Sequence, residues 1–149
     1  MRLTVYTDYA LRILMYLGTH PDDLCTIQQI ADAYGISKNH LMKVAHQLGV
    51  SGYVASHRGR GGGLRLAKPP AEIGIGDVVR ATEDDFRLVE CFDPERNSCL
   101  ITKACRLRGV LSDALDAYIA VLDRYSLGDL ISDETALLEL LDGPARKKG

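Results

Sequence analysis

Long hydrophobic runs are missing from this sequence. No apolar stretch approaches the roughly 20 residues that a membrane-spanning helix needs, and the start Met1-Arg2-Leu3-Thr4 lacks the pattern of a secretory signal peptide. The 149 residues are 46% hydrophobic, which suits one soluble domain, or at most two small ones. We therefore expect a cytoplasmic protein that has no membrane partner.

Acidic residues are missing from positions 36–70, where six basic ones occur: Lys38, Lys43, Arg58, Arg60, Arg65 and Lys68. The net charge of −2 hides this asymmetry, because residues 1–70 carry eight Lys and Arg against four Asp and Glu, whereas residues 71–149 carry ten against sixteen. A basic face on an acidic protein is an electrostatic footprint for nucleic acid. Chance clustering on a solvated surface is the alternative, and the helical pattern around these residues argues against it.

Helical periodicity recurs through the first 50 residues. Positions 4–18 predict a helix that starts at Thr4 or Thr7 and buries Val5, Ala10, Ile13, Leu14 and Leu17 on one face. Thr26 then caps a short helix, Gly35 ends it, and Ser37 caps another, which together form a helix-turn-helix. The second helix would read the DNA major groove through Ser37, Lys38, Asn39, His40 and Lys43, while Thr26 and Gln28 contact phosphate.

A β-wing is expected directly after this motif. Residues 53–56 and 64–67 alternate like strands, and the loop between them is rich in glycine and carries Arg58, Arg60 and Gly61. Glycines allow the backbone to approach phosphate closely, and arginines can enter a narrow minor groove. A phosphate-binding loop is excluded because no Gly-Lys-Ser/Thr ends this loop and no helix follows it.

The second half predicts a short helix at 73–81, an irregular acidic stretch to about residue 103, and a long helix at 106–125. Leu107, Leu111, Leu115, Tyr118 and Leu122 recur along that helix at three- or four-residue spacing. Pairing with a second copy would bury this stripe, so we expect a homodimer. Short helices at 127–131 and 135–141 and a disordered tail from 145 complete the chain.

The expected fold class is therefore mainly α with a small β-wing. Its parts are a winged helix-turn-helix domain (1–80), a cysteine-containing loop (81–104), a dimerisation helix (105–125) and C-terminal helices with the tail (126–149).

Paired Cys-x2-Cys motifs are also missing, and no histidine follows residue 57. Cys91, Cys99 and Cys105 are instead separated by seven and five residues in a polar segment that cannot build a core. This pattern favours an iron–sulfur cluster that would order the segment, over a disulfide or thiol switch and over zinc. A redox enzyme would need Cys-x-x-Cys or a thiol beside a base, so we expect no enzyme. Cys25 stands apart, and we interpret it as a small buried or half-exposed residue.

Several segments together resemble the NsrR/IscR family of winged-helix iron–sulfur regulators. They are Met1-Arg-Leu-Thr with Thr7-Asp-Tyr-Ala-Leu-Arg12, Tyr34-Gly-Ile-Ser-Lys-Asn-His40, the wing Arg58-Gly-Arg-Gly-Gly-Gly63 and the three-cysteine loop. The resemblance runs from Met1 to about Leu141. Thr7-Asp8-Tyr9, Ser37–His40 and Ile101–Leu107 look most like the nitric-oxide-sensing NsrR branch.

The resemblance implies a cofactor and its ligands. In the NsrR branch three cysteines and an aspartate of the partner subunit hold a [4Fe–4S] cluster, and those positions here are Cys91, Cys99, Cys105 and Asp8. The residues do not distinguish [4Fe–4S] from [2Fe–2S]. The IscR branch uses a histidine three residues after the last cysteine, where this chain has Arg108.

The function that the resemblance implies is a repressor that releases a palindromic operator in double-stranded DNA on reaction with nitric oxide. Residues 82–92 resemble a third branch, the iron regulator RirA, so iron sensing stays an alternative, as does a thiol redox switch without a cluster. Taken alone, Asp8 is an acid that the helix dipole favours near a helix start. Asp8 and Arg12 form the expected switch, because Arg12 lies one turn later and can pair with a freed Asp8. Glu83, Asp84 and Asp85 are competing partners for Arg12.

Overall fold

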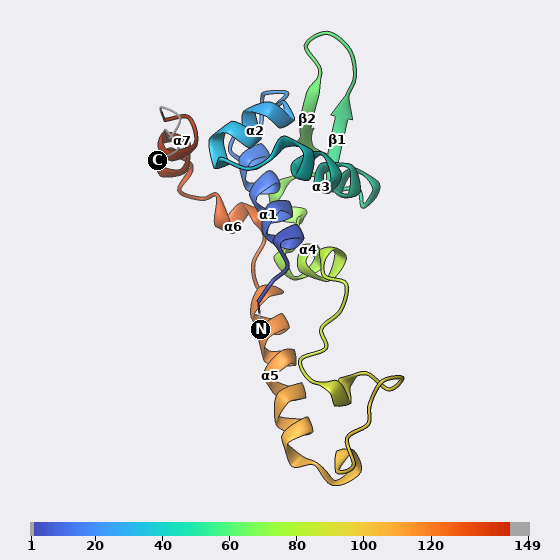
Figure 1. Cartoon of the computed structure of the whole chain (residues 1–149). Coiled ribbons are helices and arrows are strands. Elements are labelled where there is room, and N and C mark those ends of the chain that lie inside the picture. The colour runs from blue at the N-terminus through green and yellow to red at the C-terminus, as the bar shows by residue number, and fades with distance from the viewer. Residues whose placement is uncertain (1, 144–149) are drawn as a thin grey trace.

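The computed structural model describes residues 2–143. It has a compact end, built from helices and the strand pair, and an extended end, built from one long helix and an irregular loop (Figure 1). In chain order the elements are α1 (Val5–Gly18), α2 (Ile27–Tyr34), α3 (Lys38–Val50), β1 (Val54–His57), β2 (Gly63–Leu66), α4 (Ile75–Thr82), α5 (Arg106–Leu122), α6 (Leu127–Leu130) and α7 (Glu134–Leu141). Helices α1–α4 and the two strands form a winged-helix half, and α5 extends away from it. The expected fold class, mainly α with a small β-wing, is confirmed. The expected tail from 145 lies outside the described residues.

Helix α1 is the centre of the core. Its N-cap is Thr4, whose side chain accepts a hydrogen bond from the Thr7 amide, and Ala10, Ile13, Leu14 and Leu17 are fully buried. The prediction that Val5 joins this face is wrong, because Val5 is 65% exposed. Thr7 is buried instead, since Thr7 precedes Ala10 by three positions on one helical face whereas Val5 lies two positions, or about 200°, further round.

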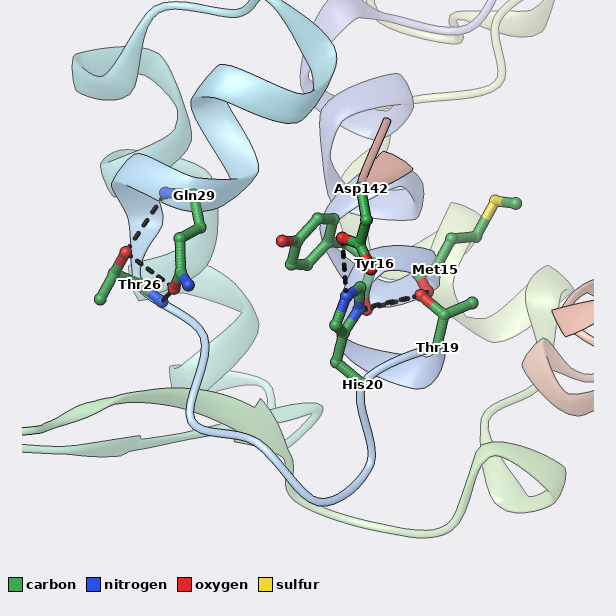
Figure 2. Close-up of polar contacts among 7 residues, drawn as sticks. All are labelled: Met15, Tyr16, Thr19, His20, Thr26, Gln29 and Asp142. Carbon is green, nitrogen blue, oxygen red and sulfur yellow. Dashed lines mark hydrogen bonds and ion pairs between the residues drawn. The ribbon is translucent and has the colours of Figure 1, made fainter. Parts of the chain in front are cut away.

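The helix-turn-helix is built by local capping. Thr26 and Gln29 form a capping box at the start of α2, as Figure 2 shows, and Gly35 ends α2 at φ +66°, a conformation that suits glycine. Ser37 occupies the N-cap of α3, but its side chain makes no capping hydrogen bond, so that part of the prediction is wrong. The buried face of α3 is the predicted one, with Leu41, Val44, Ala45 and Leu48 in the core.

The wing is an antiparallel pair in which Val54 faces Leu66 and His57 faces Gly63. Strand β1 lies one residue later than the predicted 53–56, and β2 lies one residue earlier than the predicted 64–67. Cys25 adds a short bridge to Leu64, with Cys25 N–H donating to the Leu64 carbonyl at 2.9 Å and the reverse bond at 2.8 Å. A Cβ on Gly63 would lie 2.9 Å from the Cys25 carbonyl oxygen, so glycine permits this close pairing.

Helix α5 ends at Leu122 rather than at Tyr125 as predicted. The chain leaves the helix because it pairs with residues at and just before the start of α4: the Ile75 amide donates to the Tyr125 carbonyl (2.9 Å) and the Leu127 amide to the Ile73 carbonyl (2.8 Å). Leu127 is fully buried in the same core as α1. The chain after α5 therefore returns to the winged-helix half.

Helix α7 is held beside the end of α1 by His20 (Figure 2). The ring stacks on Tyr16 with centroids 4.3 Å apart, its Nδ1 donates to the Tyr16 carbonyl at 2.8 Å, and its Nε2 lies 3.2 Å from the Asp142 carboxylate. Within residues 2–143, no helix combines the length and apolar character needed to cross a membrane.

Candidate DNA-binding face and cysteine segment

The side chains expected to read DNA project from the start of α3 and from the wing. The exposed residues there are Ser37, Lys38, Asn39, His40, Lys43, Arg58, Arg60 and Gly61, of which Gly61 offers only its backbone. The polar side chains among them make no hydrogen bond or ion pair with other described residues, and so stay available to an external ligand. Their outward position follows from the buried face of α3, because Leu41, Val44 and Leu48 point into the core.

The two residues expected to contact phosphate already have internal partners. Thr26 donates its backbone N–H to the Gln29 side chain at 2.7 Å, and its hydroxyl accepts from the Gln29 amide at 3.2 Å. Gln28 donates from Nε2 to Asp32 at 2.9 Å. Both side chains are exposed, so a phosphate would have to share or replace these contacts.

The cysteine segment, residues 83–105, carries three free thiols. Cys99 is exposed, and Cys91 and Cys105 are half-exposed. Among the residues that the structure describes, no three His, Cys, Asp or Glu side chains are grouped closely enough to hold a metal ion. The thiols are accessible but do not converge in this conformation.

Polar contacts give the cysteine segment a defined path without a bound group. Arg87 pairs with the buried carboxylate of Asp93 at 2.5 Å, and Asp93 also accepts from the Glu95 amide at 3.0 Å. The Thr102 hydroxyl donates to the Cys99 carbonyl at 2.8 Å. The expectation that only an ion or cluster could order this stretch missed these contacts, because Arg87 and Asp93 lie in irregular backbone that shows no periodicity.

Arg108 occupies the position of the histidine ligand expected in the IscR branch. Its Nε donates to the Cys91 carbonyl at 3.3 Å, and it lines a cleft of about 550 Å³ together with Cys105 and Lys103. An arginine cannot deprotonate to become a metal ligand. Arg108 instead holds the backbone of one cysteine close to the start of α5.

Cys25 is separate from this group, as expected. It is 3% exposed, and burial raises the pKa of its thiol to about 11. A buried thiol that stays protonated at neutral pH is a poor metal ligand.

Asp8 and Arg12 pair with each other on α1. The two side chains make an ion pair of 2.9 Å and a second hydrogen bond of 3.1 Å, and the Arg12 guanidinium lies 5.6 Å from the centre of the Tyr34 ring. Two of the three expected competitors for Arg12 contact other groups. Glu83 accepts from Thr4, and Asp85 accepts from the Arg87 amide.

The apolar stripe of α5 is only partly covered by the described residues of the chain. Leu111, Leu115, Tyr118 and Leu122 are half-buried, Leu107 is 61% exposed, and no α5 residue is fully buried. The sequence-based stripe missed Val110 and Val121, which are 62% and 43% exposed.

The winged helix, its exposed basic loop and the long helix after the cysteines agree with the known proteins that this chain matches. The family model Rrf2, described as an iron-dependent transcriptional regulator, matches residues 3–133. The chain belongs to the Rrf2 family. Among its relatives, the regulator NsrR of Bacillus subtilis is 55% identical over 95% of this chain and 97% of that protein. NsrR of Shouchella clausii is 53% identical over 95% of both.

Solved structures of Rrf2-type regulators share the fold. IscR of T. potens superposes with a TM-score of 0.72 at 23% identity and covers 89% of this chain and 88% of that one. CymR, the global cysteine regulator of B. subtilis, gives 0.71 at 26% identity and covers 89% and 97%. The Rrf2 chain described here is therefore a DNA-binding transcriptional regulator, and its relatives are regulators rather than enzymes.

Proposed function

We propose that this chain is a homodimeric repressor that holds an iron–sulfur cluster and releases a palindromic operator in response to nitric oxide. The ligands would be Cys91, Cys99, Cys105 and Asp8 of the partner subunit. The observation that carries the proposal is the separation of these donors. Three free thiols lie on the cysteine segment near the far end of α5, whereas Asp8 lies on α1 in the winged-helix half (Figure 1). In this conformation no three such donors are grouped among the described residues, which supports a site that a second copy of the chain completes.

The exposed part of the α5 stripe supports the dimer. A long helix at the edge of a small domain buries its apolar face most economically against its own copy across a two-fold axis. Leu107, Val110 and Val121 extend this face along most of the helix. Such a pairing places two winged-helix halves in one assembly, which matches the two half-sites of a palindrome.

The donor set fits an iron–sulfur cluster of either nuclearity, [4Fe–4S] or [2Fe–2S]. Thiolates are the usual cluster ligands, and none of the three is lost to a disulfide. When bound, the cluster would supply iron sites with which nitric oxide reacts. The residues of the chain orient the donors: Arg108 holds the Cys91 backbone and Thr102 holds that of Cys99.

The pair of Asp8 with Arg12 supports a role for Asp8 in the switch. A carboxylate that leaves a ligand position needs a new partner, and Arg12 provides one at 2.9 Å on the same helix. The DNA contacts would come from Ser37, Lys38, Asn39, His40 and Lys43 in the major groove, from Arg58, Arg60 and Gly61 at the minor groove, and from Thr26 and Gln28 at phosphate.

The test is anaerobic purification followed by native mass spectrometry, absorbance and operator binding, with nitric oxide and an iron chelator added separately. A cluster that is lost to nitric oxide together with DNA binding, and that resists the chelator, is the expected result. Cys99→Ser should abolish the cluster, whereas the control Cys25→Ser should retain it, because Cys25 lies in the core. Absence of a cluster from both the wild type and Cys25→Ser would overturn the proposal.

Iron sensing is the second candidate, and the description of the matching family model as iron-dependent favours it. It predicts that the chelator removes the cluster and releases DNA without nitric oxide. A thiol switch predicts a third pattern, in which DNA affinity survives chelation and is lost only under oxidant. The same titrations therefore distinguish all three.

A further inference from the structure

The first turn of α1 lacks a complete cap from its own residues. Helices α2 and α6 each begin with a capping box, in which the third helical residue, Gln29 or Asp129, accepts from the backbone N–H of the N-cap residue. In α1 that third position is Thr7, whose hydroxyl reaches only the hydroxyl of Thr4, at 3.1 Å. The Thr4 backbone N–H needs an acceptor from elsewhere.

Glu83 supplies that acceptor from 79 positions away. Its Oε1 accepts the Thr4 backbone N–H at 2.8 Å and the Thr4 hydroxyl at 3.0 Å. Glu83 is itself well placed, because its amide donates to the Val79 carbonyl at 2.9 Å and the preceding Thr82 is buried. A carboxylate at a helix start is also favoured by the helix dipole. Glu83 thus completes for α1 the box that Gln29 completes for α2.

Glu83 is also the first residue of the cysteine segment. Glu83 and the five residues after it line a cleft of about 540 Å³ together with residues 2–4 and with Leu115 and Tyr118 of α5. The cap of α1, the start of the cysteine segment and the stripe of α5 therefore meet in one place. Asp8 belongs to the same first turn, since its amide donates to the Thr4 carbonyl at 3.1 Å.

We propose that Glu83 is a positioning residue that passes the conformation of the cysteine segment to Asp8 on α1 of the same chain. This inference rests on the proposed function, because Asp8 acts as a ligand only in a dimer with a shared site. Its consequence is reciprocal. The cysteine segment of one chain sets the position of the Asp8 that completes the partner's site, so a change at one site is felt at the other.

The contact between Glu83 and Thr4 is tested by hydrogen exchange of the peptide containing residues 4–9 in cluster-free protein. Glu83→Ala should exchange about five-fold faster there, the size expected for a lost helix cap. Glu83→Gln should stay near the wild-type rate, because a glutamine fills the same role in α2. The matched control is Asp84→Ala, which removes an exposed neighbouring carboxylate without touching Thr4. Wild-type exchange in Glu83→Ala would overturn the inference.

Transmission is tested by perturbing the cysteine segment and reading α1. The three accessible thiols are alkylated with N-ethylmaleimide in cluster-free protein, because a bound cluster would act on Asp8 directly whatever residue stands at position 83. Exchange at residues 4–9 should change in the wild type and in Glu83→Gln but not in Glu83→Ala. A cap with a purely structural role would leave the response to perturbation equal in all three, and that result, or no response in the wild type, would refute the coupling. Alkylation needs no cluster, so failure of the proposed function alone would leave the result of this test interpretable.

Discussion

The strength of the Asp8–Arg12 pair limits what it can do as a switch. The two side chains are 46% and 40% exposed, and they are four positions apart on one helix, with the acid first. Pairs of this kind contribute about 0.3–0.5 kcal/mol. The Tyr34 ring, 5.6 Å from the guanidinium, adds about 0.5–1 kcal/mol at an exposed site. The total is close to about 1 kcal/mol, or roughly five-fold in an equilibrium constant.

We therefore expect Arg12→Gln to change the nitric oxide concentration that half-releases the operator by about five-fold or less. Asp8→Ala should have a larger effect, because it removes the proposed ligand of the partner's site rather than one weak pair. The assay is operator binding by fluorescence anisotropy during an anaerobic nitric oxide titration. A double-mutant cycle on thermal unfolding of cluster-free protein gives the pair energy directly, with about 0.3–0.5 kcal/mol expected.

Arg2→Gln is the matched control, since it removes an exposed positive charge beside the same helix start. A change above about ten-fold in Arg12→Gln with none in Arg2→Gln would refute this reasoning. Arg12 would then do more than receive a freed carboxylate.

Four further outcomes are expected. Arg58→Ala should weaken operator binding by about 1–3 kcal/mol and lower its salt dependence in anisotropy titrations, and an unchanged affinity would place the wing outside the interface. Gly62→Ala should weaken operator binding, because its Cβ would overlap the His57 carbonyl oxygen and distort the wing, whereas Gly109→Ala, with nothing within 4 Å, should raise stability by about 0.5–1 kcal/mol in thermal melts. The free energy of unfolding should fall by at most about 2 kcal/mol between about pH 9 and pH 11, because burial raises the pKa of Cys25 to about 11 and the unfolded state loses that proton first. Urea unfolding of Cys25→Ala should lack this part of the fall, and an unaltered slope would contradict the assignment.

Local patterns in the sequence predicted the winged-helix half well. Thr26, Gly35 and the buried face of α3 act within one or two helical turns, so spacing alone identifies them. The exposed residues of α3 follow from the same periodicity, because Leu41 and Val44 face the core and leave Lys38 and Lys43 outside. Elements whose ends depend on neighbouring residues can be predicted from the sequence alone.

Contacts between distant segments could not be predicted from the sequence. Helix α5 stops at Leu122 because Tyr125 pairs with Ile75, and nothing near position 125 signals that bond. The contact of Glu83 with Thr4 spans 79 positions, and an acidic stretch offers several equivalent carboxylates for it. The proposed convergence of the three thiols would depend on a group outside the chain, so neither their spacing nor the free chain defines it.

The burial of Leu127 has a consequence for anyone who would recombine this protein. Residues after α5 complete the core beneath α1, and the Ile73 and Ile75 pairings fasten them there. A cut at the end of α4 would leave a reader domain with a hole in its interior. A chimera of two such regulators should therefore exchange only the cysteine segment and α5. The winged-helix half and α6 should both come from the same parent protein.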